Sequence, residues 1–113
     1  MIGGVPIKSG EWVFLTSYIT HRHPRFWPNP EGFDPDRFLP EAVQARPRFA
    51  YFPFAGGPRQ CIGDSFAMME AQLVLATILR RVKLSVAPWQ RVQLDPLVTL
   101  RPKFGMAMVP APV

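Results

Sequence analysis

The residue types best suited to chemistry lie in one segment, Phe52-Pro53-Phe54-Ala55-Gly56-Gly57-Pro58-Arg59-Gln60-Cys61-Ile62-Gly63. We expect its cysteine, Cys61, at the start of a helix, where unpaired N–H groups and the positive end of the helix dipole favour a thiolate. Gly57 and Gly63 lack side chains, so a large flat group could approach the backbone closely. Arg59 can neutralise a carboxylate, and Phe54 could shield the sulfur from water. This set of residues suits a soft metal held in a large, planar, anionic ligand.

Haem is such a ligand, and the segment matches Phe-x-x-Gly-x-Arg-x-Cys-x-Gly at every fixed position. It therefore resembles the haem-binding loop of the cytochrome P-450 family. Ala67 and Glu70 fit the extension of that pattern into the following helix. Looser matches, in the family's order, occur at His21-Arg22, Pro24, Trp27-Pro28, Pro30, Phe33-Asp34-Pro35-Asp36-Arg37-Phe38 and Leu100-Arg101-Pro102-Lys103. The resemblance covers essentially the whole chain.

The resemblance implies haem b with an axial thiolate from Cys61, which is both the catalytic and the metal-binding residue. The positions that it places beside the cofactor are Phe54, Gly57, Arg59, Ile62, Gly63 and Ala67. Arg37 would be a structural arginine, while Leu97 and Val98 would touch substrate.

The implied activity is a monooxygenase reaction, in which O2 oxidises a small organic substrate. Its electrons would come from NAD(P)H through a ferredoxin or a flavin reductase. The thiolate would donate electron density to the iron and favour O–O cleavage. We expect Arg46, Arg48 and Arg59 to attract an acidic redox partner.

Two parts of the family pattern do not occur in these 113 residues. One is an upstream Glu-x-x-Arg motif, whose pair contacts the arginine that is Arg37 here. The other is a central helix with an acid–threonine pair. The expected fold is therefore the C-terminal part of the mainly-α cytochrome P-450 fold, and we expect this piece alone to be inactive.

Other interpretations stay open beside this one. The chain could be a non-catalytic haem-binding or sensing module, or a basic interaction fragment, given its net charge of +5. We expect no nucleic-acid partner, since the basic residues are scattered and their longest run is Arg80-Arg81. A lone cysteine is usually a buried apolar residue. His21 and His23 could share a strand face and bind a metal, but without a third ligand a structural role is favoured.

The single cysteine excludes an intrachain disulfide and a multi-cysteine metal cluster. No signal peptide is evident at the N-terminus. The most apolar stretch, from Phe66 to Leu79, contains Glu70 and is too short to cross a bilayer. We therefore expect a cytoplasmic protein without a membrane segment.

The elements that must position these residues form one partial domain, residues 1–113, of α+β character. Eight prolines between Pro24 and Pro58, and none in residues 59–87, predict an irregular stretch followed by a long helix. The predicted order is a β-hairpin and a short helical turn (1–23), a meander (24–51), the cysteine loop (52–63), a long helix (62–81) and strands (82–113). Within these ranges, we expect a hairpin at Val5–Thr16 and a second hairpin that pairs Leu97–Leu100 with Met106–Val109. We also expect the last turn of the long helix at Arg80-Arg81 and a strand at Val82–Val86.

Overall fold

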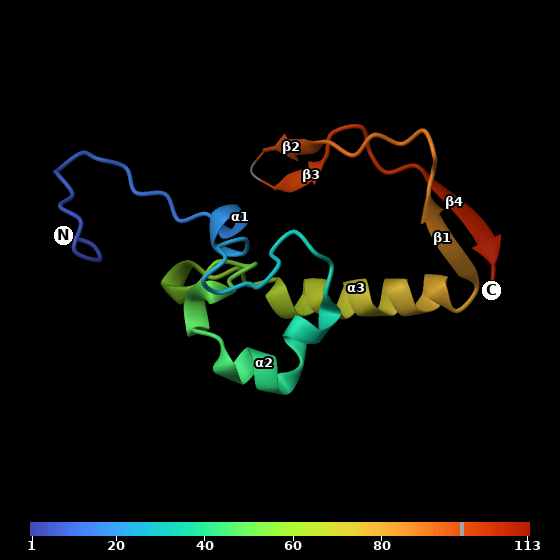
Figure 1. Ribbon diagram of the computed structural model, residues 1–113, viewed down its shortest axis with the longest axis horizontal. Helices are drawn as coiled ribbons and strands as arrows, with labels where there is room; N and C mark the ends of the chain where they lie inside the picture. The colour runs from blue at the N-terminus through green and yellow to red at the C-terminus, as the bar shows by residue number, and fades with distance from the viewer. Residues whose placement is uncertain (98) are drawn as a thin grey trace. The chain divides into compact units, whose positions relative to one another are not determined.

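The protein is described by a computed structural model that defines residues 1–97 and 99–113 (Figure 1). Two compact units make up the chain, Met1–Ile62 and Gly63–Val113. The first unit contains helix α1 (Ser17–Thr20), helix α2 (Pro40–Ala45) and 3-10 helices at Pro35–Phe38, Arg48–Ala50 and Gly57–Arg59. The second contains helix α3 (Asp64–Leu79) and strands β1 (Val82–Val86), β2 (Leu94–Pro96), β3 (Leu100–Pro102) and β4 (Met108–Pro112).

The N-terminal hairpin predicted for Val5–Thr16 is wrong. A turn does form there, because the Glu11 N–H donates to the Lys8 carbonyl at 3.2 Å. Residues 1–16, all of them described, nevertheless contain no strand beyond an isolated bridge between Ile2 and Val5. An isolated two-stranded hairpin is marginal in water unless one face is covered, and the Phe14 side chain remains 82% exposed. The short helical turn expected next in the chain is α1.

The meander consists of short helical pieces separated by prolines. Pro35 begins one 3-10 helix and Pro40 begins α2. Proline suits a first helical position, because its fixed φ is helical and its missing N–H needs no partner there. Asp34 caps the first of these helices, accepting the Asp36 N–H at 3.0 Å. The segment is thus ordered without a long helix.

The first unit is organised around a small aromatic core. Its buried apolar residues are Trp27 and Ala50, which are 3% and 2% exposed. The rings of Phe38 and Tyr51 lie 6.1 and 5.8 Å from the Trp27 ring. Aromatic pairs at these separations add to the stabilisation that apolar burial gives. The core therefore joins the start of the meander to its end.

Helix α3 begins at Asp64 and ends at Leu79, so it is shorter than predicted. Arg80 is the C-cap, and the basic pair follows the helix instead of lying in its last turn. No α3 residue is buried, and Phe66, Leu73 and Leu75 are 56–68% exposed. Apolar side chains on several sides of one helix require further structure to cover them.

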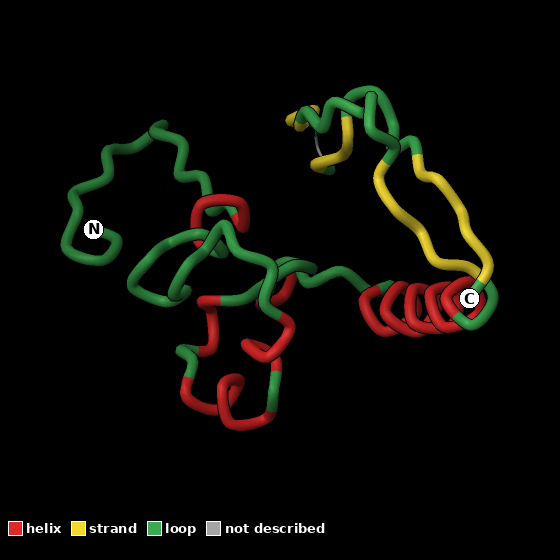
Figure 2. The backbone as a smooth tube through the Cα atoms, turned by 45° about the vertical axis from the view of Figure 1, so that its right-hand side comes forward, coloured by secondary structure: helices red, strands yellow, loops and turns green. Residues whose placement is uncertain are grey.

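The C-terminal strands pair differently from the prediction. β1 is antiparallel to β4, with Val82 opposite Pro112, and β2 is antiparallel to β3 (yellow in Figure 2). A hairpin of Leu97–Leu100 with Met106–Val109 is therefore wrong. Gln90 helps to hold the observed pairing, since its side chain accepts the Ala107 N–H at 2.9 Å and donates to the Gly105 carbonyl at 3.2 Å.

Candidate functional site

The cysteine loop, Phe52–Gly63, contains its own hydrogen bonds. The Ala55 N–H donates to the Phe52 carbonyl at 3.2 Å, and the Cys61 N–H donates to the Phe54 carbonyl at 3.0 Å. A 3-10 helix at Gly57–Arg59 makes the turn between them. The backbone therefore joins Phe54 directly to Cys61, the apolar and sulfur-bearing members of the motif.

Cys61 is an exposed free thiol. It precedes the first residue of α3 by three positions, whereas the sequence predicted a helix that starts at Ile62, directly after the cysteine. The alternative of an inert cysteine buried among apolar side chains does not apply to this arrangement. An accessible sulfur is what both metal ligation and thiol chemistry require.

The loop backbone is open beside Gly57. Gly57 has a φ of +73°, and a Cβ built there would meet nothing within 4 Å. Ala55 also has a positive φ, 63°. Such conformations are costly for residues with side chains, and the space beside Gly57 permits a close approach to the backbone. A cavity of about 380 Å³ adjoins this part of the loop and is lined by Leu15, Thr20, Phe49, Phe52, Gly56 and Gly57.

His21 holds the first residue of the loop, a contact that sequence reasoning missed. The Phe52 N–H donates to His21 Nε2 at 2.9 Å across 31 positions of sequence. Burial lowers the pKa of His21, and the positive charges of Arg22 and Arg46 lower it further. The sequence signals were a histidine close to aromatic residues and the looser family match at His21-Arg22, and neither indicated this contact.

The metal-binding alternative for His21 and His23 finds no support in residues 1–97 and 99–113, where no group of three potential metal ligands occurs. The two residues follow α1 in a helical turn, not on a strand, since the His21 N–H donates to the Ser17 carbonyl. Their rings have different neighbours, because His23 packs on Phe26 and His21 on Tyr51.

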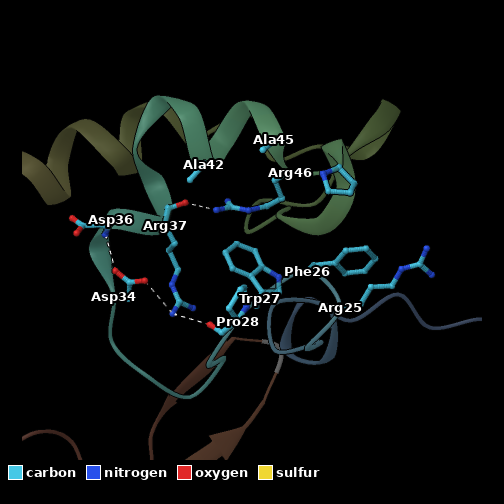
Figure 3. A pocket seen from close by; sticks show the side chains of 11 residues that line it. Arg25, Phe26, Trp27, Pro28, Asp34, Asp36, Arg37, Ala42, Ala45 and Arg46 are labelled. Carbon is cyan, nitrogen blue, oxygen red and sulfur yellow. Dashed lines mark hydrogen bonds and ion pairs between the residues drawn. The ribbon is translucent and has the colours of Figure 1, made fainter.

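Arg37 is partly buried in the meander, with its side chain 15% exposed. Its Nη2 donates to the carbonyls of Pro28, Asn29 and Gly32 at 3.3–3.4 Å and lies 3.7 Å from the Asp34 carboxylate. Figure 3 shows the contacts with Pro28 and Asp34. The Nε of Arg37 is buried without a hydrogen-bond partner among the described residues. Buried donors are normally paired, so this atom is available to a further acceptor.

Arg46 is a structural residue of the meander. Its guanidinium lies 4.0 Å from the centre of the Trp27 ring and donates to the Arg37 carbonyl (Figure 3). An arginine that is half-buried and stacked on an aromatic ring presents little of its charge to a partner at the surface. Arg48 and Arg59, by contrast, are exposed. Arg48 and Arg59 are therefore better placed than Arg46 to attract an acidic partner.

The remaining expected site residues are spread over both units. Ile62 is fully exposed, Gly63 is the N-cap of α3, and the Ala67 N–H donates to the Gly63 carbonyl at 2.9 Å. Leu97 is exposed and follows β2. Val98 lies outside the residues that the structure describes.

The loop residues fit a haem group chemically. The exposed thiol could ligate the iron, and the open backbone at Gly57 would leave room for a flat ring. Arg59 is exposed and forms no ion pair within the described part of the chain, so its charge is available to a carboxylate.

No helix within residues 1–97 and 99–113 has both the length and the apolar character that crossing a bilayer requires.

Comparison with known proteins agrees with this chemistry. The family model "Cytochrome P450" matches residues 1–109. Over 93% of its length the chain is 44% identical to cytochrome P450 4c3 of Drosophila melanogaster, and over 96% it is 43% identical to the putative cytochrome P450 132 of Mycobacterium tuberculosis. The solved structure of retinoic acid-bound cyanobacterial CYP120A1 superposes on 83% of the chain, with a TM-score of 0.76 and 34% identity. The chain spans 20% and 23% of the two relatives and 22% of the solved chain.

Proposed function

The chain belongs to the cytochrome P450 family, and from this premise we propose that it forms the thiolate-bearing haem segment of a monooxygenase. The observation that carries the proposal is Cys61, an exposed thiol in a loop whose backbone joins it to Phe54. We regard residues 1–113 as one partial domain of that enzyme. The mainly-α fold would be completed by segments other than these.

Each residue of the loop has a distinct role in this proposal. Cys61 would ligate the iron, and Phe54 would keep water from the sulfur. Gly57 and Gly63 would allow the ring to approach the backbone, and Arg59 would neutralise a propionate. Ile62 and Ala67 would supply apolar contact to the ring. N–H groups that follow Cys61 would donate to the sulfur and so tune the reduction potential.

Haem, when bound, supplies the activation of O2 that allows an oxygen atom to be placed in an organic substrate. Leu97 and Val98 are the positions through which this chain would contact that substrate. Electrons would reach the site from NAD(P)H through a ferredoxin or flavin reductase. Arg48 and Arg59 would attract such an acidic partner, because both are exposed. A reducing cytoplasm suits a cysteine that must remain a free thiol.

The chain alone would not hold haem or turn over substrate. Helix α3 leaves Phe66 and Leu73 largely exposed, which indicates that other segments must cover it. The Nε of Arg37 likewise lacks a partner among the described residues, and a carboxylate from an upstream segment would accept its hydrogen bond. These two features support the proposal that residues 1–113 act only as part of a larger assembly.

The decisive experiment substitutes the ligand in the complete protein that carries residues 1–113. The reduced carbon-monoxide complex of the unsubstituted protein should show a thiolate-type Soret band. Cys61→Ser should lose that band. Cys61→His serves as the matched control, because a nitrogen ligand can retain haem while removing the thiolate signature. A thiolate-type band that persists in Cys61→Ser would refute the assignment, because the thiolate would then come from a residue other than Cys61.

A further inference from the structure

We infer that His21 is a positioning residue for the cysteine loop: its neutral imidazole holds the Phe52 N–H and fixes where the loop leaves the meander. The inference rests on the proposed function, because the loop is the one that would present Cys61 to the haem. It concerns a residue outside the haem motif, on a turn that follows α1.

The hydrogen bond is held in place by the packing around the imidazole. His21 Nε2 lies 2.9 Å from the Phe52 nitrogen. The rings of Tyr51, Phe52 and Trp27 lie 4.8, 5.2 and 6.1 Å from the His21 ring. These rings contact it on several sides and restrict its rotation. An isosteric aromatic residue could fill the same space but could not accept the N–H.

A short series of backbone links connects this contact to the sulfur-bearing residue. Phe52 donates its N–H to His21 and accepts the Ala55 N–H with its carbonyl. Phe54, between them, accepts the Cys61 N–H. Release of the first link would free the base of the loop, so the position of the Cys61 backbone would become less restricted.

The acceptor role requires one protonation state. An imidazole accepts at Nε2 only when that nitrogen is unprotonated, so the ring proton must be on Nδ1. The charged groups that face the ring are Arg22, its neighbour in the chain, and Arg46, from the residue after α2. The titratable group packed on it is the Tyr51 phenol. Both arginines disfavour an imidazolium, which keeps the acceptor available near neutral pH.

His23 provides a matched control on the same turn. Its Nδ1 also accepts a backbone N–H, from Arg25 at 3.2 Å. That contact spans only two residues, and His23 is exposed. A substitution at His23 therefore removes a histidine acceptor without affecting the attachment of the loop.

The first measurement is hydrogen exchange at the Phe52 amide in the complete protein with nitrogen-labelled phenylalanine. His21→Phe should accelerate this exchange about tenfold, the loss expected for one hydrogen bond. His23→Phe should leave it unchanged, and His21→Gln should restore part of the protection because its amide oxygen can accept. Equal exchange in His21→Phe and the unsubstituted protein would overturn the inference.

The second measurement is the fraction of haem that is thiolate-ligated in the reduced carbon-monoxide complex. His21→Phe should lower this fraction, His21→Gln should recover it, and His23→Phe should not change it. Faster Phe52 exchange with an unchanged thiolate fraction would mean that His21 is merely structural, and would overturn the positioning role. Absence of the thiolate band from the unsubstituted protein would instead refute the proposed function, and the exchange measurement alone would then decide whether His21 holds the loop.

Discussion

The indole N–H of Trp27 donates to the carbonyl oxygen of Ala50 at 3.2 Å, across 23 positions of sequence. Both residues are almost completely buried. The bond joins the beginning of the meander to the residue that precedes Tyr51 and the cysteine loop. Together with the contact between His21 and Phe52, it fixes the point from which the loop starts.

Trp27→Phe tests this relationship. The substitution removes the donor and leaves the Ala50 carbonyl buried without its partner, so the free energy of unfolding should fall by about 1–3 kcal/mol. Urea unfolding measures the change. Trp12→Phe is the control, because Trp12 is 85% exposed and its substitution should alter stability by less than about 0.5 kcal/mol. Equal losses of unfolding free energy in the two variants would show that the hydrogen bond from Trp27 to Ala50 does not stabilise the fold.

Gly57→Ala tests the open backbone of the loop. A left-handed φ costs an alanine about 1–2 kcal/mol, and the new methyl group would enter the space that the proposed haem ring needs. Gly105→Ala is a matched control, since Gly105 has a φ of +69° and equally open surroundings. Both variants should lose similar stability in urea unfolding, but only Gly57→Ala should weaken haem binding in a titration of the complete protein. Equal haem affinities would argue against a ring beside Gly57.

Arg37→Lys tests the arginine of the meander. A lysine cannot reproduce the planar donor group that holds the carbonyls of Pro28, Asn29 and Gly32. The free energy of unfolding should therefore fall by about 2–3 kcal/mol, as expected when a buried charged donor loses its bonds. Arg25→Lys, at an exposed position, should have little effect. A tolerated Arg37→Lys would show that those bonds are dispensable.

The stability of the protein should depend on pH through His21. Its pKa is lowered in the folded state, so the unfolded chain binds the proton more readily. The contribution of His21 to the free energy of unfolding is then fully present above the ordinary histidine pKa of 6.5. It declines as the pH falls below that value, with a slope of at most about 1.4 kcal/mol per pH unit. Urea unfolding across this range, compared between the unsubstituted protein and His21→Phe, measures the contribution. Equal slopes in the unsubstituted protein and His21→Phe would mean that groups other than His21 cause the pH dependence.

Charge-reversing substitutions distinguish the electrostatic role proposed for Arg48 from the structural role of Arg46. Arg48→Glu should slow reduction by an acidic redox partner, with a difference that shrinks at high salt, because an exposed charge steers association. Arg46→Glu should instead lower the free energy of unfolding, since it removes the stack on Trp27. Stopped-flow reduction and urea unfolding distinguish these effects. An unchanged reduction rate in Arg48→Glu would contradict the proposal that Arg48 attracts the redox partner.

Sequence alone was sufficient for the family. The spacing of Phe54, Gly57, Arg59, Cys61 and Gly63 is local, and each of these types has a physical reason to stand near a planar iron ligand. The proline-free interval likewise indicated a helix, which the structure places at Asp64–Leu79. Such patterns are readable because they depend on neighbours a few residues away.

Only the tertiary structure decided the contacts between distant segments. Strand alternation does not specify a partner, so the pairing of β1 with β4 across the β2–β3 hairpin could not be read from Val82, Leu84 and Val86. The hydrogen bond from Phe52 to His21 is similar, because the family match at His21-Arg22 does not specify which backbone group the imidazole contacts. Which histidine packs against the loop depends on how the meander folds back on α1, and that is determined by packing over the whole unit.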